Sequence, residues 1–273
     1  MSAEVAVLAN NTVQKEALAL LAKKGVSCIG IEANSEKNVK DTLANCKIIV
    51  LPFPSTRTNI AFIRECKATG DYFLPEHTVI GGMINAELKD EFEKSGIKFY
   101  DYFENEAYVL KNAQLTSQGA VRLLLENTPD FLVGKKVLVT GFGRIGKSLA
   151  MILKSLGMKV FIAVRREESA VEVLALGFDV FNFNAVKGTL FYYDYIFNTV
   201  PSMLLSYRDI SHLNENAIYF ELASSPFGAD KKNFELLGKN YIHGGALPGR
   251  YYPKAVARNI VDYILDIEGG SYE

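Results

Sequence analysis

Three glycines near the middle of the chain, Gly141, Gly143 and Gly146, have the GxGxxG spacing. The apolar run 137–139 before them is typical of a buried parallel strand, and helical periodicity follows them. In this context the first glycine permits a tight turn, the second lets the backbone approach a pyrophosphate, and the third lets the helix pack on the strand. The N–H groups of the first helical turn then face the phosphates. We therefore predict a dinucleotide site, against the alternative of an ordinary strand-to-helix turn.

Two arginines, Arg165 and Arg166, follow the next predicted strand, residues 158–164. Folds that select NAD usually place Asp or Glu here to hold the ribose 2′-OH. Planar guanidinium groups instead suit a 2′-phosphate, because they pair with it in a bidentate manner. The pattern favours NADP, while NAD stays possible if Glu167 or Glu168 holds the 2′-OH and the arginines are solvated.

The loop after a further predicted strand, residues 195–200, is expected to pass the nicotinamide half of the cofactor. The residues that we predict to hold the cofactor are Gly141, Gly143, Arg144, Ile145, Gly146, Arg165, Arg166, Thr199 and Pro201.

Polar residues that could bind an anion lie in the first half of the chain. Ser55, Thr56 and Arg57 follow a predicted strand at 47–51, and ligands of open parallel sheets bind outside the carboxyl ends of strands. Gly82 lies in a second sequence of strand, glycines and helix, which could form another anion site. The alternative for the first loop is a proline-rich turn with a solvated arginine.

The elements that must position these residues form two α/β lobes. The first lobe begins as βαβαβ, with later strands at 78–80 and 97–102 and a helix over 83–94. The second begins at the glycine motif. We predict two parallel sheets, the second of Rossmann type. The expected domains are 1–127 and 128–273, with a helix at 116–127 leaving the first lobe and the final helix, 254–267, packing back near the hinge.

Composition excludes several classes of protein. The chain has 273 residues, 49% of them hydrophobic, and a net charge of −1, so no basic footprint for nucleic acid or an anionic membrane is present. We expect no secretory signal and no membrane span. Cys28, Cys46 and Cys66 have no metal-binding spacing, and we expect reduced thiols in a cytoplasmic protein without a metal site.

Four stretches of the second half carry a resemblance to a known family. They are VTGFGRIGKSLA, FNTVPSMLL, ELASSPFGAD and ALPGRYYPKAVA, with weaker counterparts GGMINAEL and NAQLTSQGA in the first half. In these motifs the chain resembles the A subunits of bacterial dipicolinate synthase. It departs from them after the first strand, where Ala9, Asn10 and Asn11 stand in place of a GGD-containing turn. That departure leaves room for another substrate.

The resemblance implies NAD(P)-dependent oxidation of dihydrodipicolinate to dipicolinate during sporulation. It also implies that the partner is a flavoprotein-like B subunit and that the protein acts in the mother-cell cytoplasm; we further expect a homo-oligomer. A substrate with two carboxylates needs cations or N–H groups on two sides. The candidates are Ser55, Thr56, Arg57, Gly82, Arg250 and Lys254. We expect the reaction between the lobes.

The sequence does not identify the catalytic base. The candidates are Glu104, Glu106, His212, His243 and Lys254. Two other functions stay open. One is a two-lobe dehydrogenase of 2-hydroxyacid or alanine dehydrogenase type, and the other is a non-catalytic NADP-binding subunit.

Overall fold

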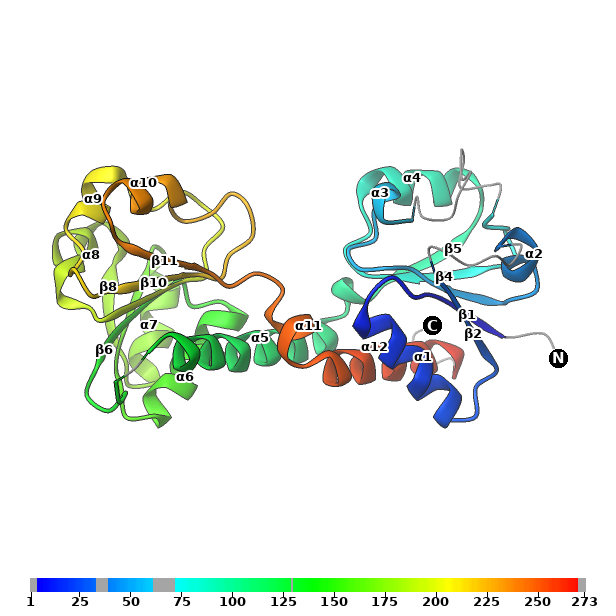
Figure 1. Cartoon of the computed structure of the whole chain (residues 1–273), viewed down its shortest axis with the longest axis horizontal. Helices are drawn as coiled ribbons and strands as arrows, with labels where there is room; N and C mark the ends of the chain where they lie inside the picture. Colours follow the sequence, from blue (N-terminus) through cyan, green and yellow to red (C-terminus); the bar gives the residue numbers. More distant parts are fainter. Residues whose placement is uncertain (1–3, 33–38, 61–71, 129, 270–273) are drawn as a thin grey trace. The chain divides into compact units, whose positions relative to one another are not determined.

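The computed structural model describes residues 4–32, 39–60, 72–128 and 130–269. The chain divides into two compact units, residues 1–112 with 249–273 and residues 113–248 (Figure 1). Helix α5 (Glu106–Asn127) begins in the first unit and ends in the second. None of the helices in these described ranges has the length and apolar content needed to cross a membrane.

The first unit contains a five-stranded parallel sheet with the order β2-β1-β3-β4-β5. Because the strand order reverses between β1 and β3, the carboxyl ends of these two strands form the switch point at which open α/β sheets bind ligands. The strands are β1 (Val5–Leu8), β2 (Cys28–Ile31), β3 (Ile48–Val50), β4 (Thr78–Gly81) and β5 (Lys98–Asp101).

Helices cover both faces of this sheet. One core cluster joins alternate strand residues, such as Ala6 and Leu8, to the helices α2 and α4 through Leu43, Leu88 and Phe92. On the other face α1 and α12 lie side by side (Figure 1). The helical elements are α1 (Thr12–Lys23), α2 (Val39–Ala44), α3 (Arg57–Ile60), α4 (Ala86–Lys94), the 3-10 turn η2 (Tyr102–Glu104) and α12 (Pro253–Glu268).

The second unit contains a six-stranded parallel sheet with the order β11-β10-β9-β6-β7-β8. Its two halves run outward from β6 in the arrangement of dinucleotide-binding folds, with the switch point between β6 and β9. The strands are β6 (Lys136–Thr140), β7 (Lys159–Val164), β8 (Asp179–Asn182), β9 (Tyr195–Asn198), β10 (Ile218–Glu221) and β11 (Asn240–His243).

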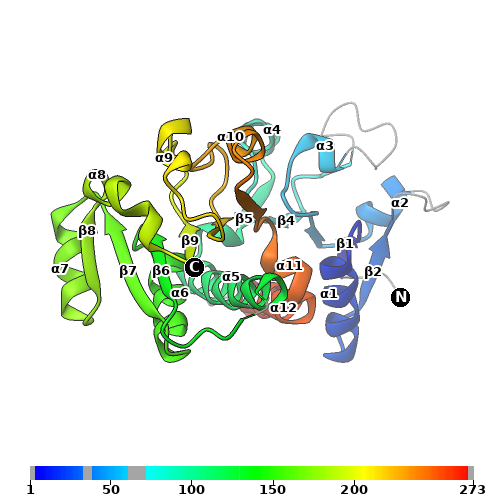
Figure 2. The same cartoon turned by 60° about the vertical axis from the view of Figure 1, so that its left-hand side comes forward.

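One face of the second sheet carries an aromatic-rich core. Tyr193, Tyr219 and Phe234 are fully buried there with aliphatic residues of the short helices around them. Figure 2 shows α9 and α10 together over this sheet. The helical elements are α6 (Arg144–Ser155), α7 (Glu167–Ala175), α8 (Phe183–Val186), the 3-10 turn η3 (Lys187–Tyr192), α9 (Tyr207–Ser211) and α10 (Lys231–Leu236). The short helix α11 (Leu247–Tyr251) begins in this unit and ends in the first.

The prediction of two parallel α/β sheets is confirmed, and two details differ. Helix α5 is longer than the expected 116–127, because Asn105 starts it early: its side chain accepts from the backbone N–H of Tyr108 at 2.9 Å. The last helix belongs to the compact unit of the first sheet, since it packs along α1. The sequence pattern assigns it to the domain 128–273, while predicting that it packs back near the hinge.

Candidate functional site

The glycine motif forms the turn between β6 and α6, and two of its glycines are fixed by close packing. Gly141 has a φ of +87°, and a Cβ there would lie 2.7 Å from the Thr199 hydroxyl and from a Val200 methyl. A Cβ on Gly146 would lie 2.3 Å from the carbonyl oxygen of Gly141. No side chain fits at either position, so the turn and the close approach of α6 both require glycine.

The middle glycine has a different environment. Gly143 is exposed, caps the N-terminus of α6, and a Cβ added there would meet nothing within 4 Å. The space above its backbone is open at the start of a 12-residue helix, whose first turn contains Arg144 and Ile145. These residues fit a pyrophosphate, because N–H groups and the helix dipole face that space.

The loop after β9 lies against this glycine turn at the switch point. The Thr199 hydroxyl donates to the carbonyl oxygen of Thr140 at 2.7 Å, and the Thr199 N–H donates to the same oxygen at 3.2 Å. Thr199 and Val200 are half-buried, and Pro201 is exposed. The structure therefore brings the predicted residues of the glycine motif and the NTVPS loop together at the carboxyl ends of β6 and β9.

A row of polar residues crosses the same edge of the sheet. Thr140, Asn198, Glu221 and His243 end four neighbouring strands and are paired in register. The Thr140 hydroxyl donates to Asn198 Oδ1 at 2.6 Å, and Asn198 Nδ2 donates to Glu221 Oε1 at 2.6 Å. The first three side chains are buried, and His243 is exposed.

Glu221 is the centre of this row, with no exposed surface. Tyr219 donates from its hydroxyl to Oε2 at 3.2 Å, and the N–H groups of Ala223 and Gly228 donate at 3.1 and 2.8 Å. Burial raises the pKa of the Glu221 carboxyl, while the hydrogen bonds from Asn198, Gly228, Ala223 and Tyr219 lower it and offset part of that rise.

The two predicted 2′-phosphate ligands follow the second strand of the unit. Arg165 and Arg166 are exposed directly after β7, and Arg166 is the N-cap residue of α7. Helix α7 is joined to α6 by an ion pair between Lys147 and Glu172. This ion pair connects α7, which follows the two arginines, to α6, which follows the glycine motif.

In the first unit, Ser55 joins two loops. Its hydroxyl donates to the carbonyl oxygen of Pro52 at 2.8 Å and accepts from the Gly82 N–H at 3.1 Å, and the side chain is fully buried. A Cβ on Gly82 would lie 2.1 Å from the Tyr102 ring. Gly82 is therefore required for packing, and both groups predicted to bind substrate here are engaged within the protein.

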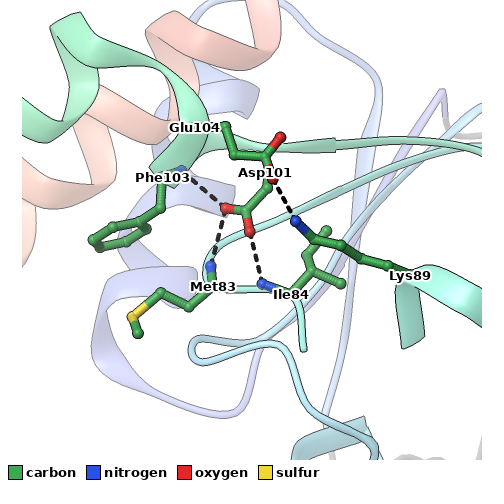
Figure 3. Close-up of polar contacts among 6 residues, drawn as sticks. All are labelled: Met83, Ile84, Lys89, Asp101, Phe103 and Glu104. Atoms are coloured by element: carbon green, nitrogen blue, oxygen red, sulfur yellow. Dashed lines mark hydrogen bonds and ion pairs between the residues drawn. The ribbon is translucent and has the colours of Figure 1, made fainter. Parts of the chain in front are cut away.

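The predicted second anion site already holds a carboxylate of the chain. Asp101 is 7% exposed and accepts from the N–H groups of Met83 at 3.0 Å, Ile84 at 2.8 Å and Phe103 at 2.9 Å (Figure 3). Met83 adopts a φ of +52°, which is uncommon for a side chain of its size. The loop after β4 has the expected geometry for an anion, but its ligand is Asp101.

The other predicted substrate residues occupy separate places. Thr56 caps α3, since the Asn59 N–H donates to its hydroxyl at 3.3 Å; the side chain of Arg57 lies outside the described part of the structure. Arg250 lies 4.9 Å from the ring centroid of Tyr251, and Lys254 is exposed in the first turn of α12.

The candidate bases differ in their surroundings. Glu104 forms an ion pair with Lys89 (Figure 3), and Glu106 is exposed in the first turn of α5. His212 is exposed at the end of α9. His243 makes an edge contact with the ring of Phe227, centroid to centroid 5.3 Å, and stands beside Glu221 in register.

Sequence reasoning missed Asp101, Asn198 and Glu221. Each ends an otherwise largely apolar strand, and an acidic or amide residue in that place is the signal that could have found them. Among the described residues, no group of three His, Cys, Asp or Glu side chains is arranged to hold a metal ion.

Comparison with known proteins shows what this arrangement is similar to. Residues 111–223 match the D-isomer specific 2-hydroxyacid dehydrogenase, NAD binding domain. The A subunit of dipicolinate synthase from Bacillus subtilis is 28% identical over 191 residues, 70% of this chain and 64% of that protein. The aligned part thus spans less than two thirds of that relative.

Solved structures share the whole fold. The A subunit of dipicolinate synthase from Bacillus halodurans superposes with a TM-score of 0.80 at 19% identity, covering 98% of each chain. Salmonella D-lactate dehydrogenase has a TM-score of 0.67 at 12% identity, covering 97% of this chain and 96% of its own. The family match agrees with the prediction of an NAD(P)-dependent oxidoreductase, and the solved structures show that the fold is shared.

The predicted resemblance is confirmed: the chain is similar to the A subunit of dipicolinate synthase, and residues 111–223, which include the glycine motif of the Rossmann-type sheet, are similar to the NAD binding domain of D-isomer specific 2-hydroxyacid dehydrogenases.

Proposed function

We propose that the chain oxidises dihydrodipicolinate to dipicolinate with a nicotinamide cofactor, as the A subunit of a dipicolinate synthase. The observation that carries the cofactor assignment is the open backbone at Gly143 beside two glycines that tolerate no side chain, at the switch point between β6 and β9. The substrate assignment rests on the similarity to the A subunit of dipicolinate synthase.

We propose NADP as the preferred cofactor. Arg165 and Arg166 are exposed after β7, where this fold contacts the ribose 2′ position, and two guanidinium groups suit a phosphate there. When bound, the nicotinamide would accept the hydride that leaves the dihydropyridine ring. Gly143, Arg144 and Ile145 would hold the pyrophosphate, and the loop from Thr199 to Pro201 would flank the nicotinamide half.

The substrate dianion needs hydrogen-bond donors or cations on two sides. Ser55 and the N–H of Gly82 are engaged within the protein, so we assign the carboxylates to Thr56, Arg57, Arg250 and Lys254. For the proton we favour His243, because it is exposed at the carboxyl edge of the cofactor-binding sheet. Glu104 is the weaker candidate, since Lys89 pairs with it. Glu106 and Lys254 are further candidates for the base that takes the proton.

The similarity also supports the biological setting that we propose. The chain would work with the flavoprotein-like B subunit of a dipicolinate synthase, in the mother-cell cytoplasm during sporulation, and as a homo-oligomer. A second candidate function is oxidation of a D-2-hydroxyacid, which the family match to residues 111–223 favours.

The test uses the purified chain with enzymatically generated dihydrodipicolinate and either NADP or NAD. Absorbance is followed at the band of the reduced nicotinamide and at the ultraviolet band of dipicolinate. Equimolar rise of both signals, faster with NADP, is expected. Reduction of the cofactor by D-lactate but not by dihydrodipicolinate would favour the second candidate. Signals that require addition of the B subunit would mean that the partner completes the site.

A further inference from the structure

Glu221 is a buried carboxylate whose partners are all neutral hydrogen-bond donors. Oε1 accepts from Asn198 Nδ2 at 2.6 Å and from the Ala223 N–H at 3.1 Å. Oε2 accepts from the Gly228 N–H at 2.8 Å and from the Tyr219 hydroxyl at 3.2 Å. Each of these four partners is a donor, so only a side chain with two acceptor oxygens matches them all.

The carboxylate fixes the orientation of the Asn198 amide. Because Nδ2 donates to Glu221, Oδ1 must face the other way, where it accepts from the Thr140 hydroxyl at 2.6 Å and the Val200 N–H at 3.1 Å. A flipped amide would place its oxygen against the Glu221 oxygen. The orientation of Asn198 is thus dictated by its neighbour.

The oriented Asn198 side chain binds the peptide groups on both sides of Val200. Asn198 Nδ2 also donates to the Val200 carbonyl oxygen at 3.0 Å, so one side chain engages both the N–H and the C=O of Val200. Val200 and Thr199 in turn lie against Gly141, the first glycine of the cofactor motif. The same carboxylate holds Gly228, where a Cβ would lie 2.3 Å from the Asn198 amide.

We propose that Glu221 is a positioning residue for the nicotinamide half of the cofactor: through Asn198 it sets the backbone of Thr199, Val200 and Pro201, and it does not contact the adenine half. This inference rests on the proposed cofactor site. A purely structural role would be expected to weaken the whole cofactor-binding sheet. The positioning role instead predicts a loss confined to the part of the cofactor that this loop flanks.

The test compares ligands that differ only in the nicotinamide group. Dissociation constants are measured by calorimetry for NADPH and for 2′-phospho-ADP-ribose, and for NADH and ADP-ribose, with the full chain. In Glu221→Gln, an isosteric change that turns one acceptor into a donor, NADPH binding should weaken about tenfold, while 2′-phospho-ADP-ribose binding stays within about twofold of the wild type.

Two further variants keep the comparison decisive if Glu221→Gln folds poorly. Tyr219→Phe removes one of the four donors and should give the same selective loss on a smaller scale. Tyr193→Phe is the matched control. It also removes the hydroxyl of a buried tyrosine in the same core, but that hydroxyl contacts Thr189 and not Glu221. It should leave both constants unchanged.

The outcomes separate this inference from the cofactor assignment. Equal weakening of both ligands, or no weakening of NADPH, in Glu221→Gln and Tyr219→Phe would overturn the positioning role and leave the cofactor site standing. Failure of the wild-type chain to bind any of the four ligands would overturn the cofactor site, and the positioning role with it.

Discussion

Asp101 in the first unit and Glu221 in the second make the same kind of contact with the loop that follows their own strand. Each is the last residue of a parallel strand, is buried, and accepts a hydrogen bond from the backbone N–H two residues further along, Phe103 at 2.9 Å and Ala223 at 3.1 Å. Asp101 also accepts from the N–H groups of Met83 and Ile84 in the loop after β4, and Glu221 also accepts from the Gly228 N–H further along its own loop. Both sheets therefore use one carboxylate to shape the loops at their carboxyl edge.

The variant Asp101→Asn tests this arrangement in the first unit. The new NH2 group would face backbone donors at Met83, Ile84 or Phe103, so at least one bond is lost and the loop after β4 opens more easily. We expect the free energy of local opening at the Met83 and Ile84 amides, measured by hydrogen exchange, to fall by about 1–3 kcal/mol.

The matched control is Glu104→Gln, which removes an exposed ion pair with Lys89 in the same region. An exposed pair contributes about 0–1 kcal/mol, so exchange at Met83 and Ile84 should change little. Equal effects of the two variants would contradict the role assigned to Asp101.

Substitutions at two glycines of the motif, Gly143 and Gly146, are predicted to have different effects. Gly143→Val should lower the melting temperature only slightly, through loss of a favoured N-cap residue, because the site around its Cβ is open and its φ of −78° suits any residue. It should nevertheless lose cofactor binding. Gly146→Ala should lower the melting temperature, because its Cβ would meet the Gly141 carbonyl oxygen at 2.3 Å. If Gly143→Val bound the cofactor with wild-type affinity, the pyrophosphate could not bind at this turn.

Arg165 is predicted to select the cofactor. Arg165→Ala should weaken NADP by about tenfold and NAD by less than about twofold, since a guanidinium pairs with a 2′-phosphate that only NADP carries. Arg208→Ala, which removes an exposed arginine of α9, serves as the control and should change neither constant. Equal losses for the two cofactors in Arg165→Ala would show that the 2′-phosphate is not bound there.

The raised pKa values of several tyrosines predict that the folded state loses stability at high pH. Burial, and then the charges of Glu221 and Asp230, raise the pKa of Tyr241 to about 12, and burial also raises the pKa of Tyr102, Tyr108, Tyr193 and Tyr219. Since the neutral phenol is favoured in the folded state, this stabilisation is complete below the ordinary pKa near 10 and is lost as the pH rises through about 12.

The measurement is a titration of phenolate absorbance with circular dichroism alongside. Part of the 14 tyrosines should ionise near pH 10 with the fold intact, and the rest together with unfolding at higher pH. A single transition at the ordinary phenol pKa for all tyrosines, with unchanged dichroism, would contradict the burial of these side chains.

The parallel sheets and the glycine motif were predictable because their signals are local. Apolar runs of strand length, each followed by a turn and a helix, occur in both halves, and the GxGxxG spacing stands directly after one of them. The start of α5 was missed because its signal is one capping residue, Asn105, within a polar segment.

The partners of buried carboxylates could not be read from the sequence. The loop at Gly81 and Gly82 has the local pattern of an anion site, but the anion comes from Asp101 at the end of the next strand. Likewise Asn198 and Glu221 are far apart in the chain and meet only because β9 and β10 pair in register. Such contacts depend on strand order, which local patterns do not determine.

The central claim is that a nicotinamide dinucleotide binds outside the carboxyl ends of β6 and β9. Hydrogen exchange of the wild-type chain with and without saturating NADPH tests it directly. We predict slower exchange at residues 142–147, 165–168 and 199–202, with the rest of the second sheet unchanged. Protection confined to other segments, or no protection at these three, would contradict the account.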